Sequence, residues 1–212
     1  IDPAPSWLNY ALAHRDDDSA CSIPITRFYA ETTVPDYPSL LGTPFCFWIG
    51  IEPQPATFIF QPILPQLVGG RFEIFSETYN DHTGDDFHSR SVFVKPGTKI
   101  FGLIEAVGTD EHGSLRYSAT AGIIGRAKQR WHSTLNDTRT PTMRAAHILC
   151  DAYVVLEHRP HQSCLQLPPN NQQQFHKMEI DWADGHSIHD INWRLFNYKP
   201  RCNSTVTMVK KN

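Results

Sequence analysis

The sequence predicts an all-β fold, an antiparallel β-sandwich or barrel, from three observations. Apolar and polar residues alternate with a period of two in several short runs, as in strands that bury one face. The 16 prolines and 12 glycines fall largely between these runs, where turns are expected. The length of 212 residues and the hydrophobic content of 40% suit one domain with a core.

We therefore expect residues 1–212 to form a single β-sandwich domain. Residues 1–44 are expected to supply an N-terminal arm and the first strands. Residues 199–212 are expected to form a C-terminal strand or a tail.

The first clear strands are two apolar runs, residues 46–51 and 57–67. Pro53 and Pro55 lie between the runs, and proline cannot donate a hydrogen bond to a sheet. Residues 52–56 are therefore expected to form a loop between two strands.

Gln61 is a lone polar residue within the second run. In an extended segment its side chain shares a face with Ile59 and Ile63, opposite Phe58 and Phe60. Two hypotheses remain open for this amide: it is a satisfied polar group of an ordinary strand, or it acts on a bound molecule.

The alternation is clearest in residues 71–79, where the two faces differ in chemistry. The apolar and hydroxyl face carries Phe72, Ile74, Ser76 and Thr78, and the acidic and aromatic face carries Glu73, Phe75, Glu77 and Tyr79. The second face is typical of either a solvated sheet surface or the wall of a ligand pocket.

Further strands follow at close intervals, separated by turn residues such as Pro96-Gly97-Thr98. One short segment near residues 142–150 has a helix-like pattern. The remaining predicted strands are residues 91–95, 99–107, 115–121, 152–156, 175–180, 192–198 and 206–209.

The cysteines and glycosylation sequons favour a secreted or secretory-pathway protein. The five cysteines form no Cys-x-x-Cys pair, which argues against zinc knuckles and thioredoxin-like sites. We expect about two disulfides, with Cys150–Cys164 as the first pairing and Cys21–Cys46 as the second, although spacing does not determine connectivity. The alternative is a set of free buried thiols in a cytosolic protein. Asn136 and Asn203 are the sequon asparagines.

Charge and motif content exclude several function classes. The net charge of −3 and the absence of a Lys/Arg run give no reason to expect nucleic acid. No apolar segment reaches the roughly 18–20 residues that span a bilayer, so no membrane partner is expected. Glycine-rich phosphate loops and a Gly-x-Ser-x-Gly elbow are absent from the sequence. The 11 histidines are read as surface residues rather than metal ligands. We expect no cofactor and no metal; a small-molecule substrate is the expected partner, and a homodimer stays open.

The order of these segments resembles the fungal glutamic endopeptidases, known as eqolisins, over about residues 48–157. Their pattern has a Trp-x-Gly-Ile segment, a catalytic glutamine in an apolar strand, an acidic and aromatic strand, and a Pro/Ala-Gly turn. The matching positions here are Trp48-Ile49-Gly50-Ile51, then Gln61, then Glu73, Phe75, Glu77 and Tyr79, then Lys95-Pro96-Gly97-Thr98-Lys99-Ile100. The resemblance implies a concanavalin A-like jelly roll with a concave ligand-binding sheet and a substrate cleft walled by these aromatic and acidic residues.

The sequence departs from the family at its second catalytic residue, a glutamate. The matching strand is Ala152-Tyr153-Val154-Val155-Leu156-Glu157, which puts Tyr153 at the glutamate's position. Glu157 lies two alternations further along on the same face. Peptide hydrolysis of this kind needs a carboxyl group and an amide.

Three functions follow from this pattern. The first is a cofactor-independent enzyme that binds a small organic metabolite and promotes a pericyclic, hetero-Diels–Alder-type cyclisation, with Gln61 or Tyr153 as hydrogen-bond donor. The chain also loosely resembles, in size and in cysteine and sequon content, the small secreted fungal hetero-Diels–Alderases of tropolonic sesquiterpene biosynthesis. The second is an acid-active glutamic endopeptidase that uses Gln61 and Glu157. The third is a secreted glycan-binding protein in which Trp48, Phe75 and Tyr79 stack on a sugar ring.

Overall fold

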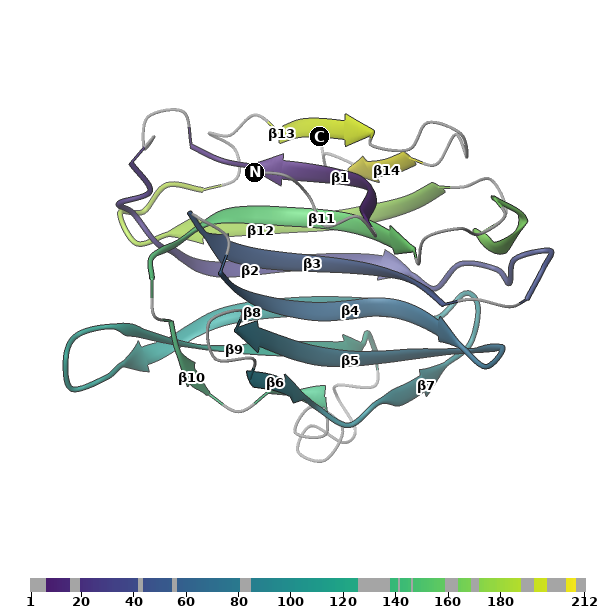
Figure 1. The fold of residues 1–212 in the computed structure, drawn as a ribbon, viewed down its shortest axis with the longest axis horizontal. Helices are drawn as coiled ribbons and strands as arrows, with labels where there is room; N and C mark the ends of the chain where they lie inside the picture. Colours follow the sequence, from purple (N-terminus) through teal and green to yellow (C-terminus); the bar gives the residue numbers. More distant parts are fainter. Residues whose placement is uncertain are drawn as a thin grey trace.

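The computed structural model confirms the all-β sandwich: two sheets stack face to face, with the six-stranded sheet behind the eight-stranded one in Figure 1. No helix in the described part of the chain is long and apolar enough to cross a membrane. The structure describes residues 7–15, 20–41, 44–54, 57–80, 85–125, 138–140, 142–145, 147–158, 164–168, 172–187, 193–197 and 205–208.

The eight-stranded sheet carries the candidate site. Its strands, in spatial order, are β13 (Trp193–Asn197), β1 (Trp7–Ala13), β11 (Leu149–His158), β3 (Phe45–Pro53), β4 (Phe58–Val68), β5 (Arg71–Asn80) and β6 (Asp85–His88), with β7 (Val92–Val94) also paired to β5. All of these pairs are antiparallel.

The six-stranded sheet covers the inner face of the first. Its order is β10 (Met143–Arg144), β9 (Leu115–Ile123), β8 (Lys99–Thr109), β2 (Ile25–Thr33), β12 (Gln172–Trp182) and β14 (Thr205–Met208). The pair of β12 and β14 is parallel, which differs from the fully antiparallel prediction.

The main core lies between the sheets and follows the alternation of the strands. On β5 the side chains of Phe72, Ile74, Ser76 and Thr78 are all buried, as predicted for the inner face. Phe58 and Phe60 of β4 also belong to this core. The other face of the eight-stranded sheet is therefore free to carry polar and aromatic groups.

A second apolar cluster covers part of that outer face. This outer aromatic cluster consists of Trp7, Tyr10, Trp48, Ile59, Ile63, Tyr153 and Val155. The ring of Trp7 meets those of Trp48 and Tyr153 edge-on, at centroid distances of 5.0 and 5.5 Å. Gln61 shares this face with Ile59 and Ile63, as the period-two pattern predicts.

Two local predictions are wrong. The helix-like segment 142–150 contains β10 and the start of β11, because its apolar residues complete the sheets instead of forming a helix. The predicted loop 52–56 begins later, since β3 continues through Glu52 to Pro53. Pro53 lies at the end of its strand, where a missing N–H costs the sheet little.

The expected disulfide pairings are also wrong, although two disulfides and one free cysteine agree with the expected number. Cys21 bonds Cys150, which ties the segment before β2 to β11 across 129 residues of sequence. Cys46 is free, and Cys164 is also disulfide-bonded. Sequence spacing favours the short 150–164 loop, but the stacking of the two sheets brings the segment before β2 next to β11. The sequons at Asn136 and Asn203 lie outside the described residues.

Candidate functional site

The outer face of the eight-stranded sheet places Gln61 in a cross-strand row. Tyr153 of β11 pairs with Gly50 of β3, and Gln61 of β4 pairs with Glu77 of β5. The pairs Trp48–Ile63 and Ile51–Phe60 set the register of β3 against β4, which puts Gly50 opposite Gln61. The row therefore runs Tyr153, Gly50, Gln61, Glu77.

Gly50 makes room in this row for an aromatic ring. A Cβ atom at Gly50 would lie 2.8 Å from Cζ3 of Trp48 and 3.1 Å from Cδ1 of Ile59. The indole ring of Trp48 therefore rests directly on the backbone of Gly50, between Tyr153 and Gln61. The ring fills the space above Gly50, so the Gln61 amide and the side chain at position 153 do not face each other directly.

A cavity of about 340 Å³ opens beside this row; we call it the Gln61 cavity. Its lining consists of Trp7, Trp48, Glu52, Thr57, Phe58, Ile59, Gln61, Glu77, Tyr79 and Glu157. These residues come from β1, β3, β4, β5 and β11 and from the segment just before β4. The cavity thus combines aromatic walls with one amide and three carboxyl groups.

The amide of Gln61 is held by Glu77. Gln61 Nε2 donates a hydrogen bond to Glu77 Oε2 at 2.8 Å. Burial raises the pKa of Glu77 above its usual value, and the charges of Asp86 and Glu157 add to this, while His88 and the Gln61 hydrogen bond act in the opposite direction. Gln61 itself is half-buried, so its remaining polar surface faces the cavity.

Glu157 reaches the same cavity from β11. Trp48 Nε1 donates a hydrogen bond to Glu157 Oε2 at 3.0 Å, and Cys46 Sγ lies 3.9 Å from the same oxygen. Burial raises the pKa of the Cys46 thiol, and the negative charges of Glu157 and Glu77 raise it further. Cys46 is therefore a protonated thiol and a poor nucleophile in this setting.

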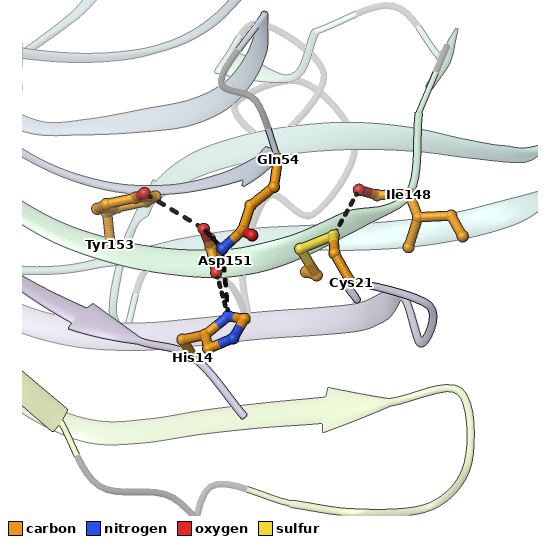
Figure 2. A network of polar contacts seen from close by, with 7 residues as sticks. His14, Cys21, Gln54, Ile148, Asp151 and Tyr153 are labelled. Carbon is orange, nitrogen blue, oxygen red and sulfur yellow. Dashed lines mark hydrogen bonds and ion pairs between the residues drawn. A yellow bond between two sulfur atoms is a disulfide. The ribbon is translucent and has the colours of Figure 1, made fainter. Parts of the chain in front are cut away.

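Tyr153 is not among the residues that line the Gln61 cavity. It is almost fully buried, and its hydroxyl donates to Asp151 Oδ2 at 3.5 Å. Gln54 Nε2 donates a hydrogen bond to Asp151 Oδ2 at 2.8 Å, and His14 Nδ1 lies 2.7 Å from Asp151 Oδ1. Figure 2 shows these side chains converging on Asp151. Burial raises the pKa of Tyr153, and the charges of Asp151 and Glu52 raise it further. The Tyr153 hydroxyl therefore stays protonated and acts as a hydrogen-bond donor to Asp151.

The structure brings together five of the predicted site residues. Trp48, Gln61, Glu77, Tyr79 and Glu157 line the Gln61 cavity. Glu73, Phe75 and Tyr153 share the outer face but do not line the cavity. Phe75 instead packs against the outer aromatic cluster and lies 5.7 Å from the ring of His88.

Sequence reasoning missed Trp7 and Glu52 as cavity residues. The neighbouring prolines predict a loop at Glu52, which the structure instead places in β3. Trp7 lies in residues 1–44, where the sequence predicts an arm and the first strands without fixing their bounds. A bulge between Trp7 and Asn9 brings Trp7 and Tyr10 into the same outer aromatic cluster.

Another, larger cavity of about 560 Å³ lies near the Cys21–Cys150 disulfide. Its polar lining includes Gln54, His112 and His147, and Tyr117 and Leu115 supply apolar surface. It shares no lining residue with the Gln61 cavity and holds none of the predicted catalytic residues. We therefore place the candidate active site at the Gln61 cavity.

The arrangement around Gln61 suits carbonyl chemistry. An amide nitrogen carries two hydrogens, and Glu77 takes only one of them. The second N–H can donate to a carbonyl oxygen of a molecule held against Trp7, Trp48 and Tyr79. Glu157 and Glu52 add carboxyl groups at the edge of the same space. Glu77, Asp86 and His88 form a cluster of ligand atoms within 4.8 Å that could hold a metal ion.

Comparison with known proteins identifies the fold. No protein-family model and no curated protein matches the chain. Among solved structures, it is similar to scytalido-glutamic peptidase with a transition state analog inhibitor, at 16% identity and a TM-score of 0.53, covering 88% of this chain and 85% of that chain. A second structure, of this peptidase with a peptide based transition state analog, gives 17% identity and a TM-score of 0.52, covering 92% and 90%. The chain therefore shares the glutamic peptidase sandwich fold, and its activity must be argued from its own side chains.

Proposed function

We propose that the protein is a cofactor-independent enzyme that binds a compact, carbonyl-bearing organic molecule in the Gln61 cavity and promotes its cyclisation. The observation that carries the proposal is the half-buried amide of Gln61, which opens into a space of about 340 Å³ walled by Trp7, Trp48 and Tyr79. Apolar and aromatic pockets of roughly 300–1,000 Å³ with few polar groups are typical small-molecule sites.

Positioning supplies the first part of the proposed rate enhancement. The aromatic walls hold the two reacting ends of the substrate together in a folded shape, which removes much of the entropy cost of bringing them into contact. Such positioning contributes up to about 7–11 kcal/mol in the most favourable cases.

Hydrogen bonding supplies the second part. The free N–H of Gln61 donates to the substrate carbonyl oxygen, which draws electron density from the conjugated system and lowers the barrier to cycloaddition. One donor aimed at developing negative charge is worth about 2.7–4 kcal/mol in a site that excludes water. Glu77 holds the amide in place, so no reorganisation is needed when the charge develops.

A pericyclic, hetero-Diels–Alder-type reaction suits this set of groups. Two σ bonds and one π bond replace three π bonds, so no electron, proton or leaving group enters or departs. The row position that faces Gln61 across Gly50 holds Tyr153 rather than a carboxyl group, and the Trp48 ring covers the gap. This region of the cleft is therefore better equipped to shape a substrate than to activate water.

A cycloaddition assay tests the proposal. An ortho-quinone methide released from a stable precursor is mixed with an electron-rich alkene, and rate and stereochemistry are compared with those in buffer. We expect faster, face-selective product formation, reduced about 10²–10³-fold by Gln61→Ala. Gln66→Ala is the matched control, because Gln66 is the other half-buried amide of β4 and does not line the cavity. Equal product ratios with protein and with buffer would contradict the proposal.

A second candidate function, acid-active peptide hydrolysis, is favoured by the position of Glu157. Glu157 and Gln61 line one cavity, although Glu157 lies two alternations beyond the strand position expected for a catalytic glutamate. The similar solved structures are of a glutamic peptidase bound to transition state analogs. In this scheme Glu157 takes a proton from water as the water attacks the peptide carbonyl, Gln61 stabilises the oxyanion, and the proton then passes to the leaving amine.

Cleavage of an unfolded protein at acid pH separates the two candidates. Hydrolysis that Glu157→Gln abolishes would favour the peptidase, whereas cyclisation that survives Glu157→Gln would favour the first proposal. Binding on a glycan array without turnover in either assay would replace both with a sugar-binding role. The Cys21–Cys150 disulfide fits an oxidising compartment, which supports our proposal of a secreted or secretory-pathway location.

A further inference from the structure

We propose that Glu77, Asp86 and His88 form a Zn²⁺ site at the rim of the Gln61 cavity. Each residue offers one ligand atom, and the three atoms lie within 4.8 Å of one another. The site shares Glu77 with the Gln61 cavity, but the proposed reaction routes no step through a metal ion.

The hairpin of β5 and β6 brings the three side chains together. Glu77 pairs with His88, and Tyr79 pairs with Asp86, so Asp86 and His88 lie two residues apart on the same face of β6. His88 Nε2 is 2.8 Å from Asp86 Oδ2 and 3.8 Å from Glu77 Oε1. In a tetrahedral site with bonds of about 2.1 Å, neighbouring ligand atoms are about 3.4 Å apart, so small side-chain rotations suffice.

Groups outside the cluster orient two of its ligands. Gln61 Nε2 donates a hydrogen bond to Glu77 Oε2. The other carboxyl oxygen, Glu77 Oε1, is the one that lies near His88. The ring of Phe75 lies 5.7 Å from the His88 imidazole, at an interplanar angle of 50°. Hydrogen bonds to ligating carboxylates and fixed imidazole rings are the usual support of metal sites.

The charge of the cluster also favours a cation. In the part of the chain that the structure describes, neither Glu77 nor Asp86 forms an ion pair with lysine or arginine, and His88 is their shared partner. A divalent cation would be attracted to these two acidic side chains, which have no lysine or arginine partner among the described residues.

The ligand types select zinc. One imidazole and two carboxylates form a three-ligand set of the kind that Zn²⁺ occupies with an open fourth position. Mg²⁺ and Ca²⁺ prefer oxygen ligands alone and usually more of them. Asp86 and His88 are both more than 40% exposed, so an ion can enter from solvent without opening the fold.

Isothermal titration of ZnCl₂ into tag-free, EDTA-treated protein tests the site, with X-ray absorption on the loaded protein to identify the ligands. We expect saturable binding of one ion with nitrogen and oxygen ligands. His88→Ala and Asp86→Asn should each weaken the Zn²⁺ affinity more than about 100-fold, and Gln61→Ala, which removes the support of Glu77, about 10-fold.

His186→Ala is the matched control. His186 Nδ1 contacts Asp184 Oδ2 at 2.9 Å, so it forms a similar exposed His–Asp pair on another part of the surface, where Arg15 rather than a second carboxylate faces the aspartate. The control should bind zinc like the native chain. Absence of saturable binding, or binding that persists in His88→Ala, would overturn the inference. Running the cycloaddition assay in EDTA keeps its outcome independent of this test.

Discussion

Gly50 controls how closely Trp48 can approach the outer face of the sheet. A Cβ atom there would lie 2.8 Å from the Trp48 ring, which is closer than side chains normally pack. The ring in turn forms one wall of the Gln61 cavity. The lack of a Cβ atom at Gly50 therefore determines where the Trp48 wall of the cavity lies.

We expect Gly50→Ala to lower the free energy of unfolding by about 1–3 kcal/mol, because the added methyl group overpacks this site. It should also push the Trp48 ring towards the Gln61 cavity. Urea unfolding measures the first effect, and a crystal structure of the variant shows the second. The double variant Gly50→Ala/Trp48→Phe is the control, since the smaller ring should recover part of the loss. Strictly additive losses would show that the two residues do not interact.

Asp151 is a fully buried carboxylate that joins three other side chains, as Figure 2 shows. Gln54 and His14 contact its two oxygens, and Tyr153 donates to one of them. Asp151→Asn replaces an acceptor oxygen with an N–H₂ group and leaves one of these partners unsatisfied. We expect a loss of about 1–3 kcal/mol in the free energy of unfolding.

Denaturant unfolding also measures this effect. Asp36→Asn provides the comparison, because Asp36 is exposed and its replacement should change stability by less than about 0.5 kcal/mol. Equal stability of the Asp151→Asn and native proteins would show that the network does not hold the end of β11 in place.

The alternation of single residues predicted which side chains share the outer face of the eight-stranded sheet. It assigned the faces of Gln61, Glu77 and Tyr79 correctly, because side-chain direction in a strand depends only on position. It missed the cluster of Glu77, Asp86 and His88, since that proximity depends on the register of the β5–β6 hairpin. Likewise, Trp7 reaches the cavity only through the pairing of β1 with β11.

At the level of elements, the strands were predicted well and their partners were not. The predicted runs 71–79, 99–107 and 115–121 correspond to β5, β8 and β9. The segment 142–150 was misjudged because short apolar runs do not distinguish a helix from strands. The period-two pattern identifies strands, but it carries no information about which strands pair with each other.

The Cys21–Cys150 disulfide joins the segment before β2 to β11, across 129 residues of sequence. A bond that closes so long a loop restricts the unfolded chain strongly. We expect the Cys21→Ala/Cys150→Ala variant to lose about 2–5 kcal/mol of unfolding free energy. Urea unfolding of both proteins without reductant measures the loss. Cys46→Ala, which removes a free thiol, serves as the control for altering a cysteine in the sheet. A double variant as stable as the native chain would contradict the expectation.

At the level of the whole molecule, the sandwich leaves one face of a large sheet open to carry the Gln61 cavity. The six-stranded sheet covers the inner face, so the outer face keeps its aromatic and acidic side chains for the cavity. The same fold serves a glutamic peptidase of 16% identity, which shows how far side chains can change while the sandwich persists. The Trp48 ring between Tyr153 and Gln61 is the feature that favours a function other than proteolysis here.

The most direct test of this account is the infrared carbonyl stretch of a bound, ¹³C-labelled cyclic enone, used as a probe of the Gln61 cavity. The native protein and Gln66→Ala should lower the frequency relative to the enone in an apolar solvent, because the Gln61 N–H draws on the carbonyl oxygen. In Gln61→Ala the bound probe should return towards the apolar-solvent value. An identical frequency in the native protein and Gln61→Ala would show that the amide does not touch the carbonyl.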